Sequence, residues 1–363
     1  MNDIGKFLNK RKFKKILVVS GKNSFYKSGV KNFINFEKIK HKIIFFFKES
    51  KIPEINELNK IIQITNLYNP NLILAIGGGS VIDYAKLTNT LYLNRNLKSK
   101  IINNKIIIKK KTILAAIPTT AGSGAEVTPN SVVYINKIKY AVDHPSLKPD
   151  YFFFVPRVII KSGLSIKSSA GFDAISQSLE SLISRKSNST SVKYATKSLK
   201  LSFKSFLNFL KKPNLKNTFD MCLAANLSGK AISISKTTAP HAVSYPFTSH
   251  FGIPHGHAVS LTLNNFLNHN YKNLQNADVD FSLKSRFQTI FNTAGVKNIK
   301  ELNDYLNFLK KNSKLSDDLP KLGINIKSKY KTILSGVNLE RLNNNPVKIS
   351  KFQLKKILFQ IGT

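Results

Sequence analysis

The pattern of hydrophobic and polar positions changes between the two halves of the chain. In roughly the first 155 residues, short apolar runs at residues 16–20, 42–47, 72–76, 112–117 and 151–155 alternate with helix-length segments. The runs are rich in Ile, Val and Phe and lack in/out alternation, which is typical of strands buried in a parallel sheet. The intervening segments, 54–68 and 81–92 among them, supply the crossover helices that parallel pairing requires.

Strand signals stop after about residue 161, and apolar residues then recur at helical spacing in segments 170–182, 191–210, 220–233 and 259–268. We therefore expect two domains. Residues 1–160 are predicted to form an α/β, doubly wound, Rossmann-like domain, and residues 161–363 an all-α domain. The polar and basic stretch at residues 94–111 is predicted to be a surface excursion or hairpin without chemistry.

Two glycine-containing loops follow strands of the first domain. The sequence GGGS at residues 77–80 opens a helix, so its backbone N–H groups can approach a pyrophosphate at a helix N-terminus. The sequence PTTAGSGAEVT at residues 118–128 offers hydroxyls suited to phosphate and ribose oxygens. Two such loops at strand ends indicate one crevice for a dinucleotide.

Four side chains of the helical half have the spacing of a metal site. Asp173 and Gln177 lie four residues apart on one helix face, where two oxygen donors can reach one cation. His241 and His255 each follow a proline that starts a helix, and the segment between them, 242–254, is rich in turn residues. Two histidines and a carboxylate suit Fe²⁺ or Zn²⁺ with open positions. From spacing alone, ordinary polar core histidines remain the alternative.

The net charge alone points to a different partner. Lys and Arg outnumber Asp and Glu by 57 to 19, a formal charge of +38, which favours nucleic acid or an anionic membrane. The excess is spread along the whole chain, however, without the Arg-rich stripes, aromatic interleaving or zinc-knuckle spacing of nucleic-acid modules. We therefore expect neither nucleic acid nor membrane as a partner.

Cysteine usage and apolar run lengths indicate the compartment. The single cysteine, Cys222, excludes an intramolecular disulfide and a cysteine-rich metal site. The basic N-terminal stretch has no apolar run long enough for a signal peptide, and no run of about 18 apolar residues occurs. We expect a cytoplasmic protein.

Several motifs, in this order along the chain, resemble those of the iron-containing alcohol dehydrogenases. They are GGGSVIDYAK at residues 77–86, PTTAGSGAEVT at 118–128, DAISQ at 173–177, PHA at 240–242 and PHGH at 254–257. The resemblance implies a dehydroquinate synthase-like fold and an oxidoreductase that interconverts aldehydes and alcohols with NAD(P)H and a divalent metal, Fe²⁺ or Zn²⁺. By family analogy, the N-terminal edge strand would allow a homodimer.

The resemblance also assigns site residues. Those expected to contact the cofactor are Gly78, Gly79, Ser80, Asp83, Thr119, Thr120, Ser123 and Lys139. The metal would be held by Asp173, His241 and His255, while Gln177 occupies the place of a family histidine and is a weaker, neutral donor. Either the metal persists with weak help from Gln177, or it has been lost; the intact histidine pair favours retention.

The end of the first strand bears on the choice of cofactor. Many NAD-using relatives carry an Asp there, and this chain has Gly21 followed by Lys22. A missing carboxylate and an added positive charge favour NADPH, with NADH as the alternative. The alternative, an ordinary surface lysine in a lysine-rich chain, explains Lys22 nearly as well.

Within the family, the sequence is similar to the phosphonoacetaldehyde reductase branch, on DAISQ, FGIPHGHAV at residues 251–259, RLNNNP at 341–346 and SISKTTAP at 233–240. That branch reduces phosphonoacetaldehyde to 2-hydroxyethylphosphonate. Lys236, Thr237 and Thr238 would then contact an anionic phosphonate, or else only cap helix ends.

The sequence leaves the proton donor and the substrate open. Tyr245, His257 or water would protonate the product alkoxide. A general dehydrogenase acting on small neutral alcohols is the main alternative function. We also considered an elimination enzyme like dehydroquinate synthase, which needs a denser set of charged ligands, and a non-catalytic binding protein, against which the intact loops argue.

Overall fold

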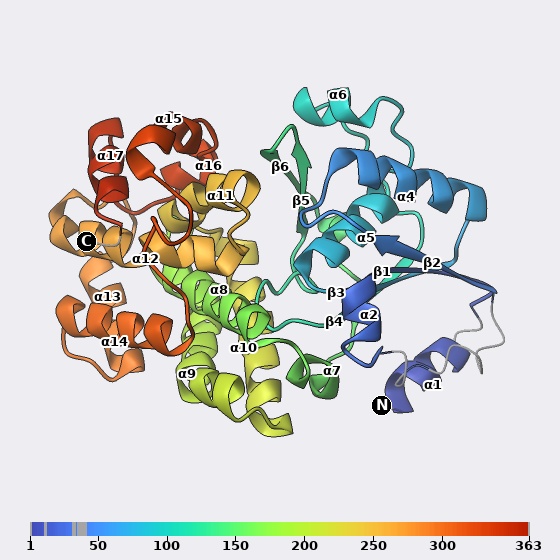
Figure 1. Ribbon diagram of the computed structural model, residues 1–363, viewed down its shortest axis with the longest axis horizontal. Helices are drawn as coiled ribbons and strands as arrows, with labels where there is room; N and C mark the ends of the chain where they lie inside the picture. Colours follow the sequence, from blue (N-terminus) through green and yellow to red (C-terminus); the bar gives the residue numbers. More distant parts are fainter. Residues whose placement is uncertain (1, 11–12, 31–33, 35–41, 362–363) are drawn as a thin grey trace. The chain divides into compact units, whose positions relative to one another are not determined.

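The computed structural model describes residues 2–10, 13–30, 34 and 42–361, so the predicted domain limits at residues 1 and 363 lie outside these ranges (Figure 1). The chain divides into two compact units. The first contains Met1–Thr120 and Gly124–Ser162, and the second contains Ala121–Ser123 and Gly163–Thr363.

The first unit is built on a five-stranded sheet in the order β2-β1-β3-β4-β7. Its strands are β1 (Lys15–Gly21), β2 (Lys42–Lys48), β3 (Leu72–Gly77), β4 (Ile113–Pro118) and β7 (Tyr151–Phe152). All the pairs are parallel, as predicted. The last strand is shorter than the predicted 151–155, because Pro156 begins the helix α7 (Pro156–Ile160).

Helices cover both faces of this sheet, which explains why its strands lack alternation. Leu17 and Val19 of β1 pack on one side with α4 (Ile55–Tyr68) and α5 (Gly79–Leu91). Ile16 and Val18 pack on the other side with α1 (Asn2–Lys10), α2 (Lys22–Tyr26) and α7. The predicted doubly wound α/β architecture is thereby confirmed.

The predicted surface excursion at residues 94–111 is wrong in part. It contains the helix α6 (Leu97–Ile102), because Leu97 and Ile101, four residues apart, are both buried in the core. The hairpin lies elsewhere, between β5 (Asn130–Ile135) and β6 (Ile138–Asp143). Its two turn residues, Asn136 and Lys137, have φ of 51° and 65°, as the twist of a two-residue hairpin requires.

The second unit is helical, as predicted. Its main helices are α8 (Leu164–Ile183), α9 (Ser189–Lys211), α10 (Leu215–Ser235), α11 (Ala239–Phe251), α12 (His255–Lys272), α13 (Leu283–Ala294), α14 (Ile299–Asn312), α15 (Ile326–Ser335), α16 (Leu339–Asn343) and α17 (Lys351–Phe359). Nearly the whole surface of α8 is buried, because α9, α10 and α12 all pack around it. Helix α8 is therefore the scaffold of this unit.

The turn-rich segment 242–254 is helical over most of its length, because α11 continues through Pro246. A proline has no N–H for the carbonyl four residues earlier, here Ala242. The backbone N–H of Asn338 donates to that carbonyl instead, at 3.1 Å. Gly336 lies so close that a Cβ there would be 2.9 Å from Pro246 Cβ. The segment leading into α16 thus replaces the hydrogen bond that the helix lacks.

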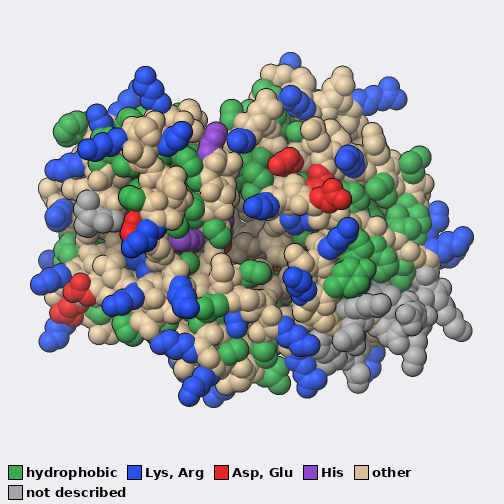
Figure 2. Space-filling model, in the orientation of Figure 1, with side chains coloured by type: hydrophobic (Ala, Val, Ile, Leu, Met, Phe, Trp, Pro, Cys, Tyr) green, Lys and Arg blue, Asp and Glu red, His purple; other side chains and the backbone are tan. Residues whose placement is uncertain are grey.

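The distribution of surface charge and the apolar character of the helices are relevant to whether the protein binds nucleic acid or a membrane. Figure 2 shows Lys and Arg side chains scattered over the visible surface of both units. Within the part of the chain that the structure describes, no helix combines the length and the apolar character that a membrane span needs.

Lys86 joins the two glycine-containing loops of the first unit. It is fully buried on α5, and its ammonium donates to Thr128 O and Oγ1, both at 2.9 Å, and to Asn130 O at 3.0 Å. Burial lowers the pKa of Lys86 to about 8, although the nearby carboxylates, Asp83 first among them, act to raise it. The helix that begins at the first loop thereby holds the end of the second.

Replacing Lys86 with Met should destabilise the protein by about 3 kcal/mol, because buried carbonyls lose a charged donor and Asp83 loses a cation. Urea unfolding followed by circular dichroism measures the change. Lys60→Met, at an exposed position of α4, is the matched control and should change stability by less than about 0.5 kcal/mol. Equal stabilities for the two variants would contradict this account.

Candidate metal and cofactor sites

Three predicted metal ligands converge within the helical unit. Asp173 lies on α8, His241 on the first turn of α11 and His255 at the start of α12, and one ligand atom of each lies within 4.8 Å of the others. His241 Nε2 is 3.3 Å from Asp173 Oδ1, and the two imidazole centroids are 5.4 Å apart. Asp173 and His241 are buried, and His255 is half-buried. This mixed nitrogen and oxygen set suits Fe²⁺ or Zn²⁺.

A glycine allows α12 to approach α8 closely enough to form this cluster. A Cβ on Gly256 would lie 1.9 Å from Ser169 O and 2.8 Å from Asp173 Cβ. Because only a residue without a side chain fits there, the position next to His255 has to be glycine. Prolines start both histidine-bearing helices, as the sequence predicted.

Glu180 belongs to this cluster and was not predicted from the sequence. It is fully buried on α8 and hydrogen-bonded through Oε1 to Nδ1 of His241. Its Oε2 accepts from Thr238 N at 2.7 Å and from Thr238 Oγ1 at 3.0 Å. A carboxylate on Nδ1 orients a histidine so that Nε2 is presented to a metal. The signal was the i, i+4, i+7 spacing of Asp173, Gln177 and Glu180, which puts all three on one face.

The electrostatics of the cluster fit a cation. Burial lowers the pKa of His241, but the negative charges of Glu180 and Asp173 and their hydrogen bonds raise it to about 10. Two buried carboxylates around one imidazole require a positive charge, from a proton or from a divalent metal. The residues present therefore fit the metal that the sequence predicts.

Gln177 is held in place by a hydroxyl. Its Nε2 lies 3.2 Å from Asp173 Oδ2, and its Oε1 lies 2.9 Å from Ser228 Oγ. In this orientation the amide nitrogen of Gln177 donates to Asp173. The amide oxygen, which is the atom that could bind a metal, accepts from Ser228 Oγ. Ligation through Gln177 Oε1 stays a prediction.

The two residues predicted as proton donors differ in position. The Tyr245 ring stacks on that of His255, with centroids 5.9 Å apart at 22°. His257 Nε2 lies 2.7 Å from Ser316 O, so its Nε2–H is engaged with a backbone carbonyl. The structure thus places Tyr245 beside the metal ligands and ties His257 to the chain beyond α14.

The predicted anion-binding residues are linked to the metal site. Lys236 is half-buried and follows α10, while Thr237 and Thr238 are buried. The alternative that they only cap helices does not hold for Thr238, whose side chain makes no cap to α11 and donates to Glu180 instead. Glu180 therefore joins this segment to His241.

The first unit brings together most of the predicted cofactor residues. Gly78 caps α5, and a Cβ on it would meet Thr120 Oγ1 at 3.2 Å; Thr119 N donates to Gly77 O at 3.0 Å. Gly79 and Ser80 form the first turn of α5, where N–H groups lack intrahelical acceptors and can receive a phosphate. Ser123 is grouped with the second unit.

Asp83 lies on α5, where the positive charges of Lys86 and Lys139 act on it. Burial raises the pKa of Asp83 to about 6, opposed by the positive charges of Lys86 and Lys139. Lys139 reaches this position on β6, the strand that the sequence analysis did not anticipate. Their contact with a cofactor stays a prediction.

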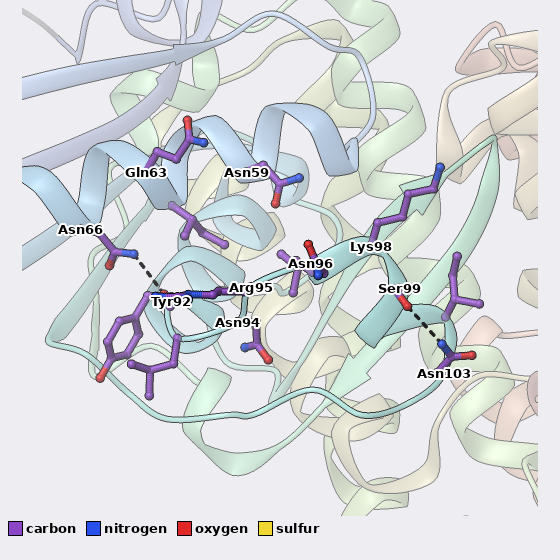
Figure 3. A pocket seen from close by; sticks show the side chains of 14 residues that line it. Asn59, Gln63, Asn66, Tyr92, Asn94, Arg95, Asn96, Lys98, Ser99 and Asn103 are labelled. Carbon is purple, nitrogen blue, oxygen red and sulfur yellow. Dashed lines mark hydrogen bonds between the residues drawn. The ribbon is translucent and has the colours of Figure 1, made fainter.

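A cavity of about 1010 Å³ in the first unit lies at the other end of α5 (Figure 3). It is lined by α4, the residues after α5, and α6. Its polar side chains bond within the wall, with Asn66 donating to Tyr92 O at 3.0 Å and Asn103 to Ser99 Oγ at 3.2 Å. Because Gly78 is about 20 Å away along a 13-residue helix, this cavity is separate from the glycine loops.

Comparisons with known proteins identify the family of this chain. Two family models match: iron-containing alcohol dehydrogenase over residues 1–156, and the C-terminal region of the Fe-containing alcohol dehydrogenase family over residues 167–361. The chain belongs to the iron-containing alcohol dehydrogenase family. The predictions of family, fold and enzyme class are confirmed, as is the use of a nicotinamide cofactor and a divalent metal in the family.

Among curated relatives, 4-hydroxybutyrate dehydrogenase of Clostridium kluyveri is 30% identical over 57% of this chain and 56% of its own length. Phosphonoacetaldehyde reductase of Streptomyces viridochromogenes is 28% identical over 55% of this chain and 53% of its own. The matched region thus spans about half the length of these curated relatives.

Among solved structures, sulfoacetaldehyde reductase of Bifidobacterium kashiwanohense in complex with NAD⁺ has a TM-score of 0.87 at 25% identity. The match covers 99% of this chain and 94% of that one. An iron-containing alcohol dehydrogenase of Thermotoga maritima, with a TM-score of 0.83 at 23% identity over 100% and 95% of the two chains, shares the fold.

Asp173→Ala should abolish metal binding and activity together, because it removes the anionic ligand of the cluster. Elemental analysis of anaerobically purified protein, combined with an aldehyde reduction assay, checks both. His250→Ala, at the exposed end of α11, is the control and should retain both. Full activity in metal-stripped Asp173→Ala protein would contradict a metal-dependent reaction.

Glu180→Gln should weaken metal affinity by about 10- to 100-fold while leaving Asp173, His241 and His255 in place, because the partner of Nδ1 loses its charge. Titration against a competing chelator measures the affinity. Glu340→Gln, exposed on α16, should leave it unchanged. An unaltered affinity in Glu180→Gln would show that the carboxylate only packs.

Proposed function

We propose that this chain is a metal-dependent NAD(P)H oxidoreductase that reduces a short aldehyde carrying an anionic group to the primary alcohol. Phosphonoacetaldehyde, reduced to 2-hydroxyethylphosphonate, is the first candidate. The observation that carries the proposal is the half-buried Lys236 in a segment bonded, through Thr238 and Glu180, to the ligand His241. A cation at that position favours a substrate with a fixed negative charge.

Three relatives support an anionic substrate. The names of the curated relatives and of the solved sulfoacetaldehyde reductase specify a carboxylate, a phosphonate and a sulfonate, each on a short chain with an alcohol or aldehyde at the other end. The three head groups differ in shape and share only their charge. The class of substrate is therefore better supported than phosphonoacetaldehyde itself.

The residues of the cluster would organise the reduction. A divalent cation held by Asp173, His241 and His255 would supply a Lewis acid for the aldehyde oxygen. NAD(P)H would supply the hydride for the carbonyl carbon, and the oxygen would need one proton, so that the products are the alcohol and NAD(P)⁺. The chain contributes orientation: Glu180 fixes the tautomer of His241, and Lys236 holds the anionic end.

Tyr245 is the better placed of the two predicted proton donors. Its ring lies against His255, whereas His257 Nε2 is engaged with Ser316 O. A tyrosine hydroxyl or a water next to it can deliver the proton that the product oxygen needs.

Cofactor choice and assembly complete the proposal. Gly21 at the end of β1 pairs with Lys48 of β2 and precedes the exposed Lys22, so lysines flank the position where NAD-using relatives carry Asp. This favours NADPH, with NADH as the alternative. β2 is an outer strand of the described sheet, and a homodimer through the edge of the sheet stays a prediction.

A general dehydrogenase for small neutral alcohols is the second candidate. The aldehyde-alcohol dehydrogenase of Streptococcus pneumoniae, 26% identical over 58% of this chain and 25% of its own length, favours it. In that case Lys236 would have no part in substrate selection, and phosphonate analogues would not compete.

Lys236→Ala should raise KM for phosphonoacetaldehyde about tenfold or more and leave KM for propanal within about twofold, because only the anionic substrate loses a charge-assisted contact. NADPH and NADH oxidation by anaerobic protein with Fe²⁺ or Zn²⁺ measures both. Lys216→Ala, exposed on α10, is the control. If the unaltered protein turned over propanal as well as or better than phosphonoacetaldehyde, the second candidate, a dehydrogenase for neutral alcohols, would be the better account.

A further inference from the structure

The turn that carries Lys236 has an unusual backbone. Lys236 has φ of 59° and ψ of 176°, a combination that residues with a Cβ rarely adopt. Such a conformation persists only where surrounding contacts determine it. The contacts that do so are therefore part of what places the Lys236 side chain.

The side chain of Asn344 supplies these contacts. Its Nδ2 lies 2.9 Å from Ser235 O, 2.9 Å from Thr237 O and 3.0 Å from Ser184 Oγ. It therefore donates hydrogen bonds to the carbonyls of the residues before and after Lys236. Asn344 is buried, and these bonds are shielded from competing water.

The carbonyl of Lys236 itself is also held. Ser235 Oγ lies 2.9 Å from Lys236 O and 2.8 Å from Ser181 Oγ on α8. The turn is thus bonded to α8 on one side and to Asn344 on the other.

Asn344 is anchored through the proline in α11. Asn338 donates its N–H to the Ala242 carbonyl that Pro246 leaves unpaired, and its side chain accepts from Arg341 N at 2.8 Å, which caps α16. At the other end of this short helix, Asn344 O accepts from Arg185 N at 3.1 Å. The position of Asn344 is fixed by α11 and by the end of α8.

We propose that Asn344 is a positioning residue that sets the preference for anionic aldehydes by holding the Ser235 to Thr237 turn, and with it Lys236, in its positive-φ conformation. This inference rests on the proposed function, because it assumes that Lys236 contacts the anionic group. In this proposal Asn344 acts through the turn, whose carbonyls it contacts.

The test is steady-state kinetics of Asn344→Ala with phosphonoacetaldehyde and propanal. KM for phosphonoacetaldehyde should rise about tenfold, with kcat, metal content and KM for propanal within about twofold of the unaltered protein. In a Lys236→Ala background the same substitution should cause no further rise, because the group it positions is absent.

Asn345→Ala is the matched structural control. Asn345 is equally buried, and its amide pairs with Asn270 and Val347 O and so does not reach the turn. Its loss should lower the melting temperature without changing the ratio of the two KM values. A ratio that changes equally in both variants would reduce Asn344 to a structural role and overturn the proposal.

Lys236→Gly and Lys236→Ala test the turn even if Asn344→Ala does not fold. Both remove the ammonium, and only glycine relieves the positive φ, so Lys236→Gly should melt a few degrees higher than Lys236→Ala. The reverse order would show an unstrained turn and overturn the proposal.

The outcomes separate the two proposals. If the unaltered protein shows no preference for phosphonoacetaldehyde over propanal, the proposed function fails and this inference fails with it. If the preference exists and is lost in Lys236→Ala but kept in Asn344→Ala, the proposed function stands and only the positioning role is overturned.

Discussion

The helical unit depends on the compensation of two buried carboxylates. Asp173 and Glu180 stand on one face of α8, a helix with almost no exposed surface, and their charges cannot be left without partners there. His241 lies against both, and Thr238 supplies two further donors to Glu180. The start of α11 is consequently fixed in position and angle. The two buried carboxylates thus determine both the position of His241 in the ligand cluster and the position of the turn before α11.

The first unit uses the inverse arrangement, a buried cation among oxygen acceptors. The ammonium of Lys86 donates three hydrogen bonds, to Thr128 and Asn130. Helix α5, which begins at the first glycine-containing loop, is therefore bonded to the end of the second. The geometry of such loops is otherwise weakly determined, since loops bury little apolar surface. In both units, buried charges and the hydrogen bonds they make hold the loops in place.

Much of this could be predicted from the sequence, because apolar runs and helical spacing report burial directly. The parallel strands and the long helices belong to this part. The convergence of Asp173, His241 and His255 was expected mainly from the resemblance of their motifs to those of the family. The helix through Pro246 could not be predicted, because a proline normally marks a boundary and its missing bond is replaced from nearly 100 residues away. The role of Glu180 was equally hidden, since only folding brings it to His241. The short β7 and the helix within 94–111 depended on tertiary contacts in the same way.

Pro246 has a consequence for how the helical unit tolerates change. By leaving one carbonyl of α11 without a helical donor, it makes a segment distant in sequence a structural part of that helix. If residue 246 had a backbone N–H, α11 could make this hydrogen bond within the helix. The segment that begins at Gly336 would then lose its hydrogen bond to the Ala242 carbonyl. The acceptor that α11 cannot satisfy by itself is therefore satisfied by the segment before α16, which closes this part of the unit.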